Sequence, residues 1–200
     1  MFHCRMLHRR MLDRRMRIVL LATASVLGLA ACASTPPASR PMPMPNSSTA
    51  RMAVANIAPA SGSLVSGKLT LMPMRDGVHV TGDIGGLAPG SRHGFHIHET
   101  GDCSAADASS AGGHFNPAAS LHGKAGAGAH HAGDIDNLVA DASGVAHVSA
   151  HVVGVSLGGG AANDIAGRAF VVHAAADDYA TQPSGNSGAR VACGAIKVAR

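Results

Sequence analysis

A pair of histidines, His96 and His98, is the first feature of this sequence that could do chemistry. The pair lies in the run Gly94–His98, which is typical of a short β-strand, and residues two apart on a strand face the same side. The two imidazoles would share one face, while Phe95 and Ile97 would share the other and could enter a core. Such a pair is half of a metal site, although many H-x-H pairs are only surface histidines.

Three more histidines and an aspartate fall within 21 residues farther along the chain: His114, His122, His131 and Asp134. Three imidazoles and one carboxylate suit tetrahedral Zn²⁺. Their irregular spacing does not fit one face of a helix, so a loop would have to wrap around the ion. His130, next to His131, leaves the third histidine open on spacing alone. His173, at the end of the run Phe170–His173, could place another imidazole beside the first pair.

Short apolar runs separated by Gly, Asp and Pro would form the strands that hold these side chains. The runs are Lys68–Met72, Val78–Ile84, Gly94–His98, Val145–Val153, Ala169–His173 and Gly194–Val198. Several alternate with period two, and none keeps the 3.6-residue period of a long amphipathic helix, so we expect an all-β sandwich or barrel. Residues 99–137 and 174–192 lack periodicity, and loops of this length are usually functional.

The first 32 residues have the pattern of an export signal. They carry six arginines against one acid, and the apolar run Ile18–Ala31 is too short to span a membrane. The run ends in Leu29-Ala30-Ala31-Cys32, which resembles a bacterial lipobox with Cys32 as the lipidated cysteine; an ordinary signal peptide is the alternative. Residues 1–15 could be an over-called gene start, with Met6, Met11 and Met16 as the other candidate start sites. Residues 33–50 hold five of the ten prolines and predict a linker, which leaves a domain at 51–200.

Charge and cysteine content fit an exported domain. The net charge of +4 comes from the leader, because residues 33–200 carry ten basic and eleven acidic side chains, so no nucleic-acid partner is indicated. Cys4 lies in the leader and Cys32 in the lipobox. The remaining pair, Cys103 and Cys193, predicts a disulfide in an oxidising compartment, with two free thiols as the alternative.

Seven motifs resemble, in order, those of copper/zinc superoxide dismutases, in the style of the bacterial members. They are GFHIHE, GGHFNP, the LHG at 121–123, HAGD, FVVH, the ADD at 176–178 and GARVACG, and the match as a whole extends over most of residues 65–200. The resemblance implies a Greek-key β-sandwich or flattened eight-stranded barrel that binds one copper and one zinc ion per subunit. It also implies the ligands: His96, His98, His114 and His173 for copper, and His114, His122, His131 and Asp134 for zinc. The HAGD motif selects His131 over His130.

The same resemblance assigns three further roles. His114 would bridge the two metals and supply a proton, Asp177 would link a copper histidine to a zinc histidine, and Arg190 would meet the anionic substrate. The implied activity converts superoxide to oxygen and hydrogen peroxide through alternating Cu(II) and Cu(I). The alternative is a non-catalytic copper- and zinc-binding protein on the same fold. Residues 179–189 carry no charge, so steering of superoxide would fall to Lys124 and Arg190.

The remaining expectations concern the location of the protein in the cell and the histidines and methionines outside the predicted metal sites. The protein is expected in the periplasm, held by its lipid alone in the outer membrane because Ala33 is not acidic, with monomer and homodimer both open. Five histidines are expected to be exposed or structural: His79, His93, His130, His147 and His151. The methionines flanking prolines are not expected to bind copper: Met42, Met44, Met72 and Met74.

Overall fold

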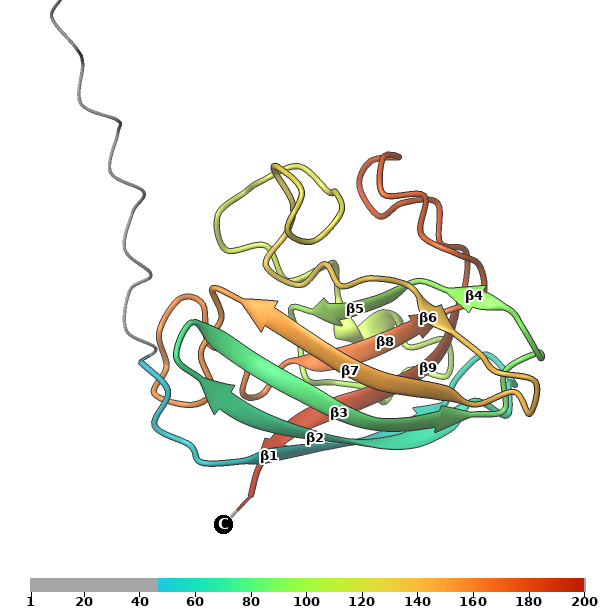
Figure 1. Cartoon of the computed structure of the whole chain (residues 1–200), viewed down its shortest axis with the longest axis horizontal. Helices are drawn as coiled ribbons and strands as arrows, with labels where there is room; N and C mark the ends of the chain where they lie inside the picture. The colour runs from blue at the N-terminus through green and yellow to red at the C-terminus, as the bar shows by residue number, and fades with distance from the viewer. Residues whose placement is uncertain (1–46, 200) are drawn as a thin grey trace, which may run out of the picture. The chain divides into compact units, whose positions relative to one another are not determined.

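The computed structural model describes residues 47–199 (Figure 1). The predicted signal peptide, Cys32 and most of the predicted linker lie outside the described residues. Within the described part, no helix is long and apolar enough to cross a membrane. Near the start of the described part, the hydroxyl of Ser48 accepts a hydrogen bond from the amide of Leu157, and the amides of Thr49 and Ala50 donate to the Leu157 carbonyl.

Seven antiparallel strands form one curled sheet in the order β5-β8-β9-β1-β2-β3-β7, and two short strands, β4 and β6, form a second. The strands of the large sheet are β1 Ala53–Pro59, β2 Ser66–Met74, β3 Gly77–Gly85, β5 Phe95–His98, β7 Ala146–Val153, β8 Ala169–His173 and β9 Arg190–Val198. The small sheet pairs β4 Arg92–His93 with β6 Leu138–Val139. One 3₁₀ turn, η1, spans Ser109–Ala111. The predicted all-β fold is confirmed, with the strands divided seven and two.

Period-two alternation places one face of the sheet in the core. On β2, Leu69 and Leu71 are buried while Met72 is exposed, and on β3 Val78 and Val80 are buried on either side of His79. Phe95 of β5 stacks on Phe170 of β8 with ring centroids 5.1 Å apart. Because the sheet curls, apolar side chains from β1, β2, β3, β5, β7, β8 and β9 meet in one cluster.

Each predicted strand matches an observed one, but Gly94 and Val145 lie one residue outside β5 and β7. β1 was not predicted, although it pairs with both β2 and β9 near the middle of the sheet. The second predicted loop, 174–192, is shorter than expected because residues 190–192 already belong to β9, where they pair with β1 and β8. The first predicted loop, 99–137, contains only the turn η1, as expected. The two loops rise from the same side of the sheet (Figure 1).

The predicted disulfide is confirmed. Cys103 in the long loop is bonded to Cys193 of β9, with Cα atoms 5.7 Å apart, and the bridge spans 90 residues. It fixes the beginning of the 99–137 loop to the strand that also carries Arg190.

Candidate metal centre

β5 is buried on both faces, which explains how four consecutive side chains can serve two purposes. Phe95 and Ile97 enter the apolar core, while His96 and His98 point to the opposite side and are also buried. The strand is the edge of the seven-stranded sheet, and the 99–137 loop covers it. An unpaired strand edge needs such cover, and here the cover brings the remaining ligands.

The loop reaches β5 twice, and each time it delivers a polar side chain. The amide of Phe115 donates to the Ile97 carbonyl at 2.8 Å, and the amide of Ile97 donates to the Gly133 carbonyl at 2.8 Å. His114 therefore lies opposite His98, and Asp134 lies opposite His96. Gly133 is required for this approach, since a Cβ at that position would overlap the carbonyl oxygen of Ile97.

Four histidines converge, and each offers one ring nitrogen that has no hydrogen-bond partner. The atoms are His96 Nδ1, His98 Nε2, His114 Nε2 and His173 Nε2. All four are buried without a hydrogen-bond partner, and ligand atoms of these residues lie within 4.8 Å of one another. Buried polar nitrogens are rarely left without a partner, so four together need an explanation. One ion at their centre would satisfy all of them, and an all-nitrogen set suits copper.

The second group surrounds one carboxylate oxygen. Asp134 Oδ1 lies 2.9 Å from His114 Nδ1, 3.0 Å from His122 Nδ1 and 3.3 Å from His131 Nδ1. The nitrogens of His114 and His131 are 3.3 Å apart. With metal–ligand bonds of about 2 Å, ligand atoms of a tetrahedral zinc site lie about 3.3 Å apart. The spacing therefore fits Zn²⁺, and the group includes His131 rather than His130.

His114 belongs to both groups and offers a different nitrogen to each. Its Nδ1 faces Asp134 in the tetrahedral group, and its Nε2 is one of the four bare nitrogens. The imidazole is buried between the two sets, with its ring centroid 4.0 Å from that of His96. A single ring could thus bridge two ions.

Asp177 holds one histidine of each group. Its Oδ2 accepts a hydrogen bond from His96 Nε2 at 2.8 Å, and its Oδ1 accepts from His122 Nε2 at 2.9 Å. These bonds leave the Nδ1 atoms of both rings to face the metal groups, as expected for ligand histidines. Asn137 fixes the Asp177 backbone through two hydrogen bonds. Gly185 closes over Asp177 at φ +68°, where a Cβ would overlap the carboxylate.

The group of His96, His98, His114 and His173 is called the copper-type group below. Backbone oxygens orient two of its members, His98 and His173. His98 Nδ1 donates to the Gly112 carbonyl at 2.9 Å, and His173 Nδ1 donates to the Gly188 carbonyl at 3.2 Å. A carbonyl acceptor on one ring nitrogen leaves the other free of a proton and able to bind a metal. The rings of His96, His98 and His173 are therefore held in the tautomer that leaves one nitrogen free to bind a metal.

Burial and hydrogen bonding keep the two kinds of ligand in opposite charge states. Burial lowers the pKa of His98 to about 2, of His173 to about 3 and of His96 to about 4, so these rings stay neutral. Burial raises the pKa of Asp177, but hydrogen bonds from His96 and His122 lower it further, to about 2. The pKa of Asp134 is also lowered, because donors from His114 and from backbone amides outweigh its burial. Neutral imidazoles and ionised carboxylates are the metal-binding forms.

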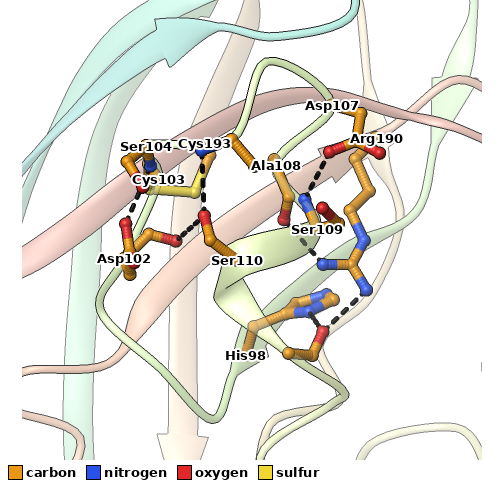
Figure 2. Close-up of a disulfide and its surroundings, with 12 residues drawn as sticks. His98, Asp102, Cys103, Ser104, Asp107, Ala108, Ser109, Ser110, Arg190 and Cys193 are labelled. Carbon is orange, nitrogen blue, oxygen red and sulfur yellow. Dashed lines mark hydrogen bonds between the residues drawn. A yellow bond between two sulfur atoms is a disulfide. The ribbon is translucent and has the colours of Figure 1, made fainter.

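Arg190 is the first residue of β9 and lies beside His98 of the copper-type group (Figure 2). Its Nη1 donates to the Ala108 carbonyl at 2.7 Å, and its Nη2 donates to the Gly112 carbonyl at 2.6 Å. Two fixed donors hold the planar guanidinium in one orientation, so its positive charge is presented to the site at no further conformational cost. Neither backbone oxygen could have been predicted, because every residue carries a carbonyl.

Residues outside the two metal-type groups support the site through other contacts. Among the histidines expected to be structural, His93 is buried and donates from Nδ1 to the His173 carbonyl at 2.7 Å. Lys124 lies over the ring of Tyr179, with Nζ 5.5 Å from its centroid, which joins the two long loops. The hydroxyl of Tyr179 accepts a hydrogen bond from the amide of Asn137. Asn137 and Tyr179 thus support Asp177, and no motif in the sequence predicts this role.

Comparison with known proteins agrees with this geometry. Residues 65–196 match the family described as copper/zinc superoxide dismutase (SODC). The chain is 37% identical to the superoxide dismutase-like protein YojM of Bacillus subtilis, over 90% of this chain and 95% of that one. It is 42% identical to a Cu-Zn superoxide dismutase of Caulobacter vibrioides, over 66% of this chain and 78% of that one.

Solved structures show the same likeness. A crystal structure of a superoxide dismutase-like protein from Bacillus subtilis is 39% identical, with a TM-score of 0.65 over 71% of this chain and 96% of that one. The clock protein EA4 is 38% identical, with a TM-score of 0.67 over 76% of this chain and 97% of that one. The sequence match, the fold and the two histidine groups lead to one conclusion: the chain belongs to the copper/zinc superoxide dismutase family.

Proposed function

We propose that this protein is an active superoxide dismutase that holds one copper and one zinc ion. The observation that carries the proposal is the set of four buried, unpartnered ring nitrogens, one of them on a histidine shared with the tetrahedral group. Copper would be held by His96, His98, His114 and His173, and zinc by His114, His122, His131 and Asp134. When bound, copper supplies the one-electron oxidation of one superoxide and the one-electron reduction of a second.

The chain's own residues bind the substrate and move protons. Arg190 presents a fixed guanidinium that can pair with the superoxide anion through charge and hydrogen bonds. His114 can hold a proton at Nε2 and pass it to the reduced substrate, while solvent supplies the second proton. Two superoxide anions and two protons thus yield one oxygen and one hydrogen peroxide. Asp134 and Asp177 keep the rings oriented throughout.

The test measures superoxide decay with the purified chain after loading with copper and zinc. We expect rapid decay in the parent, none above background in His96→Ala, and reduced decay in Arg190→Ala. His147→Ala is the matched control, since His147 is an exposed histidine on β7 and should leave the rate unchanged. Metal content is measured in every sample. Full occupancy of both metals without turnover in the parent would contradict the proposal and leave a metal-binding protein.

We also propose that the protein is exported to the periplasm and anchored in the outer membrane through a lipid on Cys32. Support comes from the basic and apolar leader, the lipobox-like Leu29-Ala30-Ala31-Cys32 and the neutral Ala33. The test expresses the chain in a Gram-negative host with radiolabelled palmitate and separates the two membranes. Label in the outer membrane that disappears in Cys32→Ser is expected. A soluble, unlabelled parent would contradict the anchor, and label in the inner membrane would contradict the destination.

A further inference from the structure

The outer face of the large sheet carries side chains in rows that cross β2, β3 and β7. Strand register defines three rows: Lys68–Asp83–His147, Thr70–Thr81–Ser149 and Met72–His79–His151. The first row contains charged groups and the second hydroxyls. The third contains a thioether and two imidazoles, which are ligands for soft and borderline metals. None of its members belongs to the buried metal groups.

The members of the third row point away from the core. Their strand neighbours Leu71, Val80 and Val152 are buried, so alternation turns Met72, His79 and His151 outward. Met72 is 55% exposed, and the side chain of His151 is 35% exposed. A dissolved metal ion can therefore reach these side chains directly.

The two imidazoles already stand at a separation suited to one ion. His79 and His151 are cross-strand partners with ring centroids 6.4 Å apart and an angle of 37° between the rings. With metal–nitrogen bonds of about 2 Å, the centroids of two imidazoles on one ion lie about 5 Å apart at a tetrahedral angle and about 6 Å apart when the two bonds are nearly collinear, so a small movement of the rings would bring both onto one ion. Met72 is paired with His79 on the opposite side, and its three rotatable bonds allow the sulfur to bend toward the ion.

Hydrogen bonding distinguishes this pair from the neighbouring histidine. His151 Nε2 donates to Asp76 Oδ1 at 2.9 Å, which leaves Nδ1 for a metal and matches the carboxylate support that ligand histidines usually have. The imidazole of His79 makes no side-chain hydrogen bond within residues 47–199, although its backbone belongs to the β3 ladder. His147, by contrast, has Nδ1 2.6 Å from Asp83 and Nε2 3.5 Å from Asp141, so both its nitrogens are engaged.

We propose, against the expectation from the sequence that Met72 binds no copper, that Met72, His79 and His151 form a surface copper(I) site, with Asp76 as the residue that orients His151. Imidazole and thioether together favour Cu(I), whereas the two imidazoles alone would also accept Zn²⁺ or Cu(II). Because the site is exposed, its ion can exchange with other donors, unlike an ion held in the buried centre. The site shares no residue with that centre, so it stands whether or not the protein dismutates superoxide.

The test titrates Cu(I), in competition with a coloured chelator, into the whole chain already loaded with copper and zinc. We expect one further Cu(I) to bind per chain, with sulfur as a neighbour in X-ray absorption at the copper edge. Met72→Leu should weaken Cu(I) binding at least about tenfold while leaving weak Zn²⁺ binding at the two histidines. The double variant His79→Gln with His151→Gln should lose both. Asp76→Asn should weaken binding about tenfold.

His147→Gln is the matched control, because His147 is an exposed histidine on β7 and lies on the same face of that strand as His151. Zinc release and circular dichroism are recorded in each titration to show that the buried centre and the fold are intact. The proposal is overturned if no further Cu(I) binds, if the double variant binds it as the parent does, or if His147→Gln loses it equally. Copper bound without a sulfur neighbour would remove Met72 from the site.

Discussion

Arg190 donates a hydrogen bond from Nη2 to the backbone oxygen of Gly112, 2.6 Å away. The same oxygen accepts a hydrogen bond from His98 Nδ1 at 2.9 Å, so one carbonyl orients both the guanidinium and a copper-type histidine (Figure 2). The position of the positive charge and the orientation of the ligand are therefore coupled through Gly112.

The first prediction concerns the shape of the cation at position 190. Arg190→Ala should lower kcat/KM about 10–100-fold, because charge-assisted hydrogen bonds are worth about 1.5–3 kcal/mol. The kcat/KM of Arg190→Lys should lie between those of the parent and Arg190→Ala. A lysine keeps the charge but lacks the forked guanidinium that donates to both Ala108 and Gly112. Superoxide decay at several ionic strengths measures this. A lysine variant as active as the parent would mean that charge alone matters.

The second prediction concerns the carboxylate shared by the two groups. Asp177→Asn can accept from only one of His96 and His122, so zinc should bind about 10–100-fold more weakly. Competition with a zinc chelator measures the change. Asp178→Asn is the control, because Asp178 is exposed and its carboxylate bonds only within its own loop, at Ala180 and Thr181. Equal zinc affinity in Asp177→Asn and the parent would contradict the supporting role.

The two metal-type groups could be predicted because most of their histidines are clustered between residues 96 and 131, and His173 follows a recognisable strand. His96 and His98 share a strand face by simple alternation, and the HAGD motif separates His131 from His130. Arg190 and Asp177 were expected from the family motifs, and the structure adds the contacts that hold them. Gly112 and Ala108 could not be expected, since they act through backbone oxygens that carry no sequence signal.

Contacts between distant strands were beyond prediction for a different reason. Alternation says that Met72, His79 and His151 face outward, but not that they are neighbours, because register depends on how β2, β3 and β7 pair. The same limit applies to β1, which pairs with β2 close by in the sequence and with β9 more than 100 residues later. Pairwise register is a tertiary property, and a single sequence carries little of it.

The third prediction concerns the disulfide between Cys103 and Cys193. The bridge closes a span of 90 residues, so its removal in Cys103→Ser with Cys193→Ser should cost about 4–5 kcal/mol of unfolding free energy in the chain-entropy model. Activity should fall as well, because the loop that it anchors supplies the Ala108 oxygen to Arg190. Urea unfolding of parent and double variant measures the stability. An unchanged midpoint would show that the loop is held by other contacts.

The fourth prediction concerns the pH dependence of protein stripped of its metals. Burial lowers the pKa of His98 to about 2, of His173 to about 3 and of His96 to about 4, from an ordinary value of 6.5. As pH falls below 6.5 the unfolded chain takes up protons that the folded chain does not, so the unfolding free energy should decrease. The loss for each histidine stops once pH has passed its pKa in the folded protein. The lowered pKa of Asp177 adds a further loss between its ordinary value of 3.8 and about 2.

Urea unfolding of the stripped protein between about pH 8 and about pH 4 tests the sign, with a slope of about 1 kcal/mol per pH unit for each histidine. His147 works in the opposite direction, because its hydrogen bond to Asp83 raises its pKa, so its stabilisation is present at low pH and is lost as pH rises through that value. Its exposure keeps the effect small. His98→Gln should flatten the acid slope and His147→Gln should not. Stability that rises as pH falls from 6.5 toward 4 would mean that the copper-type rings are protonated in the folded chain, and they could then not hold a metal there.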